Sequence, residues 1–534
     1  MANVVALAYG LGVTMIVAFG ITALILTRRV AKDKLQDSEW FLTARRSVGP
    51  SIIAFSFMSS GLGAWVPSSM SAYGVSAGII GLVFYAVSCG IPIIIIAHVG
   101  AVLNRKYPGV QSLGDFVQWR YGTIPTVVVT LIMLFTMSIG LCAEYTAIGN
   151  LFEFIVGGPR LPIVIVIAVV TAIYTAAGGL YVSILTDVAQ GIFGIGMLVI
   201  IAIYVAVTYR PTSLPPLSDD PILGPNYWGY AAIVAMPISL TCSTIFSEAP
   251  WQRVWASADH KALKKGSYVG ALGLIVICFL YGFGGFLALW AKFPTNDPTG
   301  GTAFFDLLGA GEATPPTWIL MVAVLATCAM SEGNVDSLQN GIVDTIATRL
   351  FRGKSVWYAR ALVFLINIPT VFVSLRGYNI ISLFLVGNLV CTFSAMPVVL
   401  GLVTRLEGYI TGISMLFGMF LGFWSICVFG YLKKGDFQAG MTFVFTESYD
   451  WPSFVLPLVF SCIGVFLAAA VEGAVRKACG WQYPIPLNPP PEARIEERGE
   501  PARAVDSFHS SFPEEPQYHF AGDDSKKTLS TSHQ

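Results

Sequence analysis

The chain has 534 residues, of which 55% are hydrophobic and only 12% are charged, and its formal net charge is zero. Soluble domains carry about 25% charged residues, so this composition excludes a soluble multidomain protein. The balanced charge also gives no basic field that would attract nucleic acid. Residues 481–534 hold 14 of the 62 charges, which leaves 48 for the first 480 residues. We therefore predict an all-α polytopic membrane protein with a polar tail.

The hydrophobic residues are grouped into thirteen segments, most of them long enough for a helix that crosses a bilayer. This pattern predicts thirteen transmembrane helices. In chain order they lie near residues 4–27, 51–76, 77–103, 124–156, 161–180, 183–208, 229–250, 266–292, 318–350, 359–375, 379–402, 409–431 and 452–475.

Lysine and arginine predict the orientation, because cytosolic loops are enriched in these residues. With the N-terminus outside, 20 of the 31 Lys and Arg residues fall in inner loops, 6 fall in outer loops and the rest lie in the tail. The C-terminus is then cytosolic. The tail, residues 481–534, is rich in Pro, Glu, Ser and Arg, and we expect it to be disordered because it cannot bury a core.

The second and seventh segments contain residues that interrupt helices. Transporters use such breaks to expose backbone groups to a solute or an ion near the middle of the membrane. The two segments are five apart, which fits two five-helix inverted repeats that each open with a broken helix. The alternative is that Gly, Ser and Pro occur in these segments only because they are common in membrane helices. The interrupting residues are Ser59, Ser60, Gly61, Gly63 and Pro67 in the second segment, and Pro237, Ser239, Thr241, Ser243 and Pro250 in the seventh.

Ionisable residues inside the apolar segments give a further signal, because they are costly in a bilayer and usually functional. Glu144 lies in the middle of the fourth segment, next to Tyr145. In the ninth segment, Glu332, Asp336 and Gln339 are spaced by four and three, so they share one helical face. We expect that face to point into the bundle or along a wet pathway. The alternative is a hydrogen-bond ladder between helices that binds no ligand.

Several chemistries have no signature in the sequence. There is no G-x-x-x-x-G-K-[ST] phosphate loop, no H-E-x-x-H and no G-x-S-x-G motif. The nine cysteines form no C-x-x-C pair, and most lie inside apolar segments, where they are interpreted as small hydrophobic residues. We therefore expect neither an enzyme with catalytic residues nor a cofactor.

Four short motifs stand out in the apolar body. They are 174–180 (YTAAGGL) with 186–190 (TDVAQ), 105–109 (RKYPG) with 120–122 (RYG), 251–253 (WQR), and Tyr73 with Gly74. These motifs resemble those of the sodium:solute symporter family. The most specific is the first pair, which is similar to the family's G-G-L and T-D-V-x-Q hallmark. The resemblance covers roughly residues 4–475. A weaker likeness points to the urea transporter branch.

The resemblance implies the LeuT-like fold, which is two inverted five-helix repeats plus flanking helices, and alternating access driven by a cation gradient. The implied division has five parts. They are residues 1–50 (first helix and cytosolic linker), 51–208 (first repeat), 209–402 (second repeat), 403–480 (two C-terminal helices) and 481–534 (tail).

The resemblance also implies a sodium site between the broken second segment and the ninth segment. Backbone carbonyls near Phe57 and Ser60 would bind the ion, which suits a hard cation. In the ninth segment, the two positions that carry hydroxyl ligands in the family fall on Cys328 and Ala329. Neither residue is a good sodium ligand, so the sequence departs from the family pattern here.

Neighbouring residues could compensate for this departure. Thr327 and Ser331 flank the two positions and would supply hydroxyls. Asp187 resembles the family's acid on the inner exit path of the cation. A proton is the alternative coupling ion, and it would be carried by an acid such as Glu144, Glu332 or Asp336.

The resulting prediction is a secondary active transporter that takes up a small polar solute by symport with Na⁺ or H⁺. Urea or a related small nitrogen compound is the expected solute. The alternatives are a polyamine, an amino acid, a sugar or a carboxylate, or a nutrient sensor or passive channel with the same fold. The expected partners are the solute, the cation and the lipid bilayer of the plasma membrane, without nucleic acid. The expected solute-binding residues are Ser59, Ser60, Gly61, Trp65, Glu144, Tyr145, Pro237, Ser239, Thr241 and Glu332.

Overall fold

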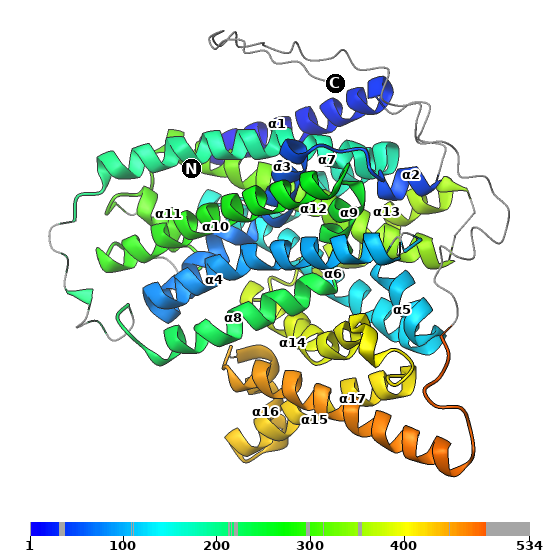
Figure 1. The fold of residues 1–534 in the computed structure, drawn as a ribbon. Coiled ribbons are helices and arrows are strands. Elements are labelled where there is room, and N and C mark those ends of the chain that lie inside the picture. The colour runs from blue at the N-terminus through cyan, green and yellow to red at the C-terminus, as the bar shows by residue number, and fades with distance from the viewer. Residues whose placement is uncertain are drawn as a thin grey trace, which may run out of the picture.

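A computed structural model gives the fold, and it is built almost entirely from helices (Figure 1). It describes residues 2–30, 38–107, 109–110, 112–211, 214, 216–217, 220, 223–294, 300–312, 314–350, 355–447 and 449–487. The expected tail lies outside the described residues from position 488 onward, as does the stretch 31–37 of the expected linker.

The helices follow one another with short connections. In chain order they are α1 (Ala2–Val30), α2 (Ser38–Thr43), α3 (Pro50–Gly61), α4 (Trp65–Lys106), α5 (Leu113–Tyr121), α6 (Thr123–Asn150), α7 (Arg160–Thr208), α8 (Tyr227–Ile245), α9 (Glu248–Ala256), α10 (His260–Trp290), α11 (Ala303–Leu308), α12 (Thr317–Leu350), α13 (Val356–Ser374), α14 (Ile380–Val399), α15 (Gly412–Lys434), α16 (Phe437–Thr442) and α17 (Pro452–Ala478). A π-helical turn, η1 (Leu151–Val156), continues α6, and another, η5 (Phe443–Glu447), follows α16.

Eleven helices in the described part of the chain are long and apolar enough to cross a membrane. Two of them are far longer than one crossing needs. α4 has 42 residues and α7 has 49, whereas about 20 residues span the hydrocarbon core. Each has a sharp kink at a glycine with positive φ, Gly78 (64°) in α4 and Gly179 (62°) in α7. Counting each kinked helix as two spans would give the thirteen that the sequence predicts, and that count stays a prediction.

The two expected helix breaks have different outcomes. The second segment is interrupted where expected, because α3 ends at Gly61 and α4 begins at Trp65. In the seventh segment, α8 runs through Pro237 and ends only at Ile245, before α9 begins at Glu248. The interruption is therefore displaced toward the C-terminal end of the segment. A proline inside a membrane helix is tolerated when neighbouring groups satisfy the freed backbone.

The packing brings both interruptions to the centre of the bundle. α4 packs along α8 and α10, α3 packs on α10 and α7, and α12 packs against α7 and α6. The C-terminal helices α15 and α17 lie at one edge of the molecule (Figure 1), where they pack on each other and on α14, with smaller contacts to α8, α6 and α5. The site is therefore formed by the central helices, with α15 and α17 outside it.

Candidate solute and cation site

The unwound stretch between α3 and α4 is held by one buried carboxylate, that of Glu144 on α6. Its Oε2 accepts hydrogen bonds from the backbone N–H of Ala64 (2.9 Å) and from the hydroxyl of Ser331 on α12 (3.2 Å). Its Oε1 accepts one from the side-chain amide of Asn334 (3.0 Å). A Cβ at Gly63 would lie only 1.9 Å from Oε1. Glycine at position 63 therefore lets the carboxylate reach the N-terminus of α4, where the helix dipole favours an anion.

The charge of Glu144 has hydrogen-bond donors around it but no cationic side chain. The residue is fully buried, and none of the ion pairs formed by described residues includes it. Both oxygens accept hydrogen bonds, as suits an ionised carboxylate. A buried anion without a counter-charge is costly. This arrangement therefore favours a bound cation, whether an ion or a charged group of a solute.

A cavity of about 190 Å³ lies next to this carboxylate, between α4, α6, α8, α12 and α14. Asn334 connects the two, because it lines the cavity and donates to Glu144. The other polar lining groups include Thr136, Ser243, Thr244 and Asn388. Drug-sized ligands occupy roughly 300–1,000 Å³, so this central cavity suits a small solute.

Aromatic rings form much of the remaining wall. Trp65 lies edge-on to Phe384, with 5.6 Å between ring centroids, and 6.3 Å from the ring of Tyr85. Tyr449 also lines the cavity, and Tyr73 links it to Tyr85 at centroid distances of 6.3 and 5.0 Å. Aromatic faces attract ammonium groups through cation–π interactions. The wall can therefore hold apolar carbon and a positive charge.

A second buried charge cluster joins α3, α7, α9 and α12 through Arg253. Its Nη2 donates to Oδ2 of Asp187 (2.9 Å) and to the hydroxyl of Ser337 (2.6 Å). The hydroxyl of Ser56 donates to the same Asp187 oxygen (2.6 Å), while Nε of Arg253 donates to Ser56 (3.1 Å). The side chains of Arg253 and Asp187 are both 0% exposed. The cluster therefore ties the broken helix α3 to three others.

The residues expected to bind solute are spread over several places. Only Trp65 lines the central cavity, and Glu144 is joined to it through Asn334. Tyr145 donates to Asn367 and is fully buried. Pro237 and Thr241 line a different, almost entirely apolar cavity of about 350 Å³.

The other expected residues are placed by packing within the bundle. Ser59 is buried, and its hydroxyl would lie 3.1 Å from a Cβ at Gly333. Ser60 is half-buried, and a Cβ at Gly61 would meet Leu274 of α10. Ser239 and Glu332 are 0% exposed, and their side-chain oxygens have no hydrogen-bond partner among the residues that the structure describes.

The side chains expected to bind the cation form hydrogen bonds or packing contacts with other protein groups. Ser60 donates to the carbonyl of Phe57 (3.4 Å). Thr327 donates to Ala323 within α12 (2.8 Å). Cys328 faces α1, with its sulfur 3.5 Å from where a Cβ at Gly12 would stand. Ser331 donates to Glu144 and Asp187 is paired with Arg253, as described above.

Sequence reasoning missed two residues that the geometry makes prominent. Asn334 is one, since it lines the cavity and binds Glu144. It lies two positions after Glu332, on a different part of the helical turn from the acidic residues that the sequence analysis selected. Arg253 is the other. It was noted only as part of the 251–253 motif, although a fully buried arginine needs a counter-charge.

Solved structures with the same architecture are membrane transporters. A substrate-bound, outward-open Na⁺-coupled sialic acid symporter matches with a TM-score of 0.63 at 15% identity, over 86% of this chain and 97% of that one. Mhp1, a nucleobase-cation-symport-1 family transporter, matches with a TM-score of 0.56 at 14% identity, over 85% and 97% of the two chains. The expected all-α, LeuT-like fold is confirmed.

Sequence comparisons give one family match and two relatives. A family model described as "Sodium:solute symporter family" matches residues 41–213. The spermidine transporter DUR31 of Candida albicans is 28% identical over 84% of this chain and 87% of its own length. The sodium/pantothenate symporter of Escherichia coli is 23% identical over 50% and 56%. The chain is an integral membrane protein that resembles the sodium:solute symporter family, as its motifs predicted. Its place in the urea branch stays a prediction.

Proposed function

We propose that this chain takes up a linear polyamine of the spermidine type by symport with sodium. The observation that carries the proposal is the central cavity, which has an aromatic wall and a buried carboxylate, Glu144, without a cationic partner. A polyamine offers what this site lacks, namely ammonium groups separated by short apolar stretches. The relative from Candida albicans, described as a spermidine transporter, adds independent support.

In this proposal one ammonium group of the solute lies beside Asn334, close enough for Glu144 to compensate its charge. The methylene groups pack on Trp65 and Phe384. Because three donors already orient Glu144, little reorganisation is needed when the solute binds. The two repeats, residues 51–208 and 209–402, move relative to each other and expose the cavity to either side in turn.

Sodium is the proposed coupling ion, because the family is named for it and the E. coli relative is a sodium symporter. Its ligands would come from the carbonyls of Phe57 and Ser60 and from the hydroxyl of Thr327 or Ser331. In the proposed cycle, Asp187 attracts the ion on its inner path once its contact with Arg253 opens. A proton remains the alternative ion.

The proposed location is the plasma membrane with the N-terminus outside, which the distribution of Lys and Arg supports.

Urea is the second candidate solute. The side-chain amides of Asn334 and Asn388 line the cavity and offer both donors and acceptors, which urea requires. Urea carries no charge, however, and would leave Glu144 uncompensated. The two solutes therefore differ in their dependence on that carboxylate.

The test is uptake of labelled spermidine and labelled urea into vesicles that hold the purified full-length protein, with sodium and proton gradients imposed separately. We expect concentrative, sodium-driven uptake of spermidine. Glu144→Gln should weaken spermidine binding at least about thirtyfold, since losing one partner of a desolvated charge pair costs roughly 2 kcal/mol or more.

Glu312→Gln, an exposed acid before α12, is the matched control and should leave uptake unchanged. Uptake of urea but not spermidine would contradict the polyamine assignment. Uptake driven only by protons would contradict sodium coupling. Spermidine uptake that Glu144→Gln leaves intact would remove that residue from the site.

A further inference from the structure

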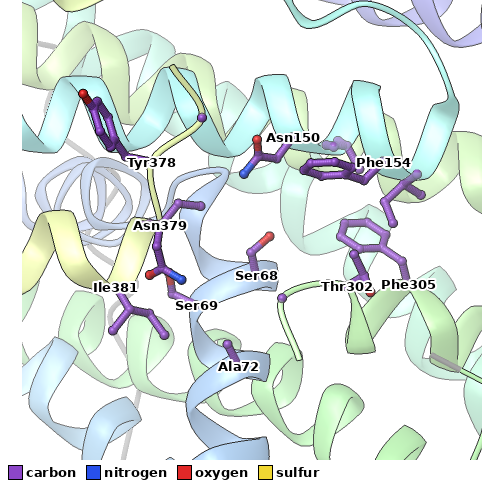
Figure 2. Close-up of a pocket in the computed structure, with 15 residues that line it drawn as sticks. Ser68, Ser69, Ala72, Asn150, Phe154, Thr302, Phe305, Tyr378, Asn379 and Ile381 are labelled. Atoms are coloured by element: carbon purple, nitrogen blue, oxygen red, sulfur yellow. The ribbon is translucent and has the colours of Figure 1, made fainter. Parts of the chain in front are cut away.

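The cavities outside the central site differ in the chemistry of their walls. One, of about 240 Å³, has a wall that includes the polar residues Ser69, Asn150 and Asn379 (Figure 2). Another, of about 350 Å³, is almost entirely apolar and lies between α4, α5, α8, α14 and α17. We call this one the apolar crevice. None of its lining residues is charged. Water finds few partners in such a space, so the crevice suits an apolar ligand.

The apolar crevice adjoins the surface of the molecule that meets lipid. Ile95 of α4 lines the crevice and is 37% exposed. Leu458 of α17 also lines it, and the next two residues, Val459 and Phe460, are exposed. Exposed apolar side chains on helices that cross a bilayer contact lipid tails. The crevice is therefore within reach of an acyl chain from the bilayer.

Exposed cations lie at one end of the apolar crevice. Leu103 lines it, and Arg105 and Lys106 follow within the next turn of α4. In the turn after α14, Leu402 lines the crevice, and Arg405 follows three positions later. None of the ion pairs between described residues includes any of these three cations. Their charges are therefore available to an anion.

Two sets of hydrogen bonds hold the cationic end together. Nζ of Lys106 donates to the hydroxyl of Thr404 (2.9 Å), which joins the end of α4 to the turn after α14. Arg120 of α5 is buried and donates to three backbone carbonyls between positions 401 and 410. The cations of the two segments are therefore held next to each other before any ligand binds.

The charge at this end is complementary to an anionic headgroup. Glu407, the acid nearest to Arg405 in the chain, accepts a hydrogen bond from the hydroxyl of Tyr107 (3.2 Å). In the predicted orientation this end of the molecule faces the cytosol, and the cytosolic leaflet carries anionic phospholipids. Basic groups at the cytosolic ends of membrane helices bind such headgroups.

We propose that the apolar crevice binds one anionic phospholipid of the cytosolic leaflet, with an acyl chain inside the crevice and the phosphate at Arg105, Lys106 and Arg405. Ile245 and Trp251 line the crevice on either side of the break between α8 and α9. The acyl chain therefore packs against that break. The lipid site does not depend on which solute the protein carries.

The test is native mass spectrometry of the purified full-length protein, titrated with palmitoyl-oleoyl phosphatidylserine and with the phosphatidylcholine that has the same acyl chains. We expect phosphatidylserine to bind at least about tenfold more tightly. Lys106→Gln/Arg405→Gln should weaken its binding about thirtyfold, because each cation beside an anionic lipid contributes about a factor of five. Arg28→Gln/Arg29→Gln, which removes two exposed cations at the end of α1, is the matched control and should leave binding unchanged.

A second variant tests the position of the acyl chain. Val399→Trp, at a half-buried position in the wall, should fill part of the apolar crevice. It should weaken binding of the long-chain phosphatidylserine at least about tenfold, because methylene groups lose their apolar contacts. Binding of dihexanoyl phosphatidylserine should not change, since its short chains hardly enter the crevice.

Equal binding of the two headgroups by the wild type, or unchanged binding after Lys106→Gln/Arg405→Gln, would overturn the headgroup site. Long-chain binding that Val399→Trp leaves intact, in a protein that unfolds at the wild-type temperature, would overturn the acyl-chain site. An equal loss in the Arg28→Gln/Arg29→Gln control would also contradict the proposal, because any basic surface would then serve.

Discussion

Three buried carboxyl groups in the bundle have three different environments. Glu144 receives hydrogen bonds from a helix N-terminus and two side chains. Asp187 is paired with Arg253. Glu332 has no hydrogen-bond partner in the described ranges. All three were singled out from the sequence, because ionisable residues in apolar segments are conspicuous. Their differing environments were not foreseeable, because the partners lie far away along the chain.

The buried pair of Asp187 and Arg253 leads to a prediction about stability. Asp187→Asn should destabilise the fold by about 3–5 kcal/mol, because it leaves the Arg253 guanidinium buried without a counter-charge. The double variant Asp187→Asn/Arg253→Met should recover much of that loss, since both charges are then gone. Thermal unfolding of the purified proteins measures both effects.

Glu312→Gln, an exposed acid, serves as the control and should unfold like the wild type. A single variant as stable as the wild type would refute the structural role of the pair. Uptake measured on the same proteins tests the proposed exit path, because unchanged transport kinetics in Asp187→Asn would exclude it.

Glycines at the kinks and breaks explain why the long helices can be accommodated. Gly179, inside the 174–180 motif, has φ of 62°, and a Cβ there would lie 2.5 Å from the carbonyl oxygen of Phe41. Gly63 makes room for Glu144 in the same way. The interruption near Gly63 was predicted because its Gly and Ser cluster disfavours helix locally. The displaced end of α8 was not, because tertiary contacts let the helix continue past Pro237.

A glycine comparison within α7 tests this interpretation. Gly179→Ala should lower stability by at least about 1–3 kcal/mol, because alanine is strained at positive φ and its Cβ meets backbone. Gly196→Ala, in the same helix with nothing within 4 Å of the new Cβ, should be neutral or raise stability by up to about 1 kcal/mol. Unfolding temperatures of the two variants provide the measurement. Equal effects would mean that the kink does not depend on glycine.

At the scale of the whole molecule, hydropathy predicted the helical body well. The segment 161–180 and the segment 183–208 correspond to the two halves of α7, and the segment 51–76 to α3 with the start of α4. Hydropathy depends only on neighbouring residues, so each membrane span can be predicted without knowledge of the tertiary structure. The orientation in the membrane stays a prediction from Lys and Arg.

Cysteine labelling tests that orientation. Cys479, just after α17, is the only one of the nine cysteines that is exposed in the structure. With the C-terminus cytosolic, a membrane-impermeant maleimide should label it only after cells are permeabilised. Glu312→Cys in a Cys479→Ser background should be labelled in intact cells, because residue 312 lies in a predicted outer loop. The reverse pattern would invert the topology.

The sequence by itself determined that this is a helical membrane protein with family-like motifs, because apolar spans, the glycine-rich break before α4 and short motifs are all properties of neighbouring residues. Only the tertiary structure decided which polar groups meet. Asn334 and Glu144 are 190 residues apart, and Asp187 and Arg253 are 66 apart. Such pairs depend on how α6, α7, α9 and α12 pack. A helical pattern restricts a side chain to a face but does not name the residue that it will contact across the bundle.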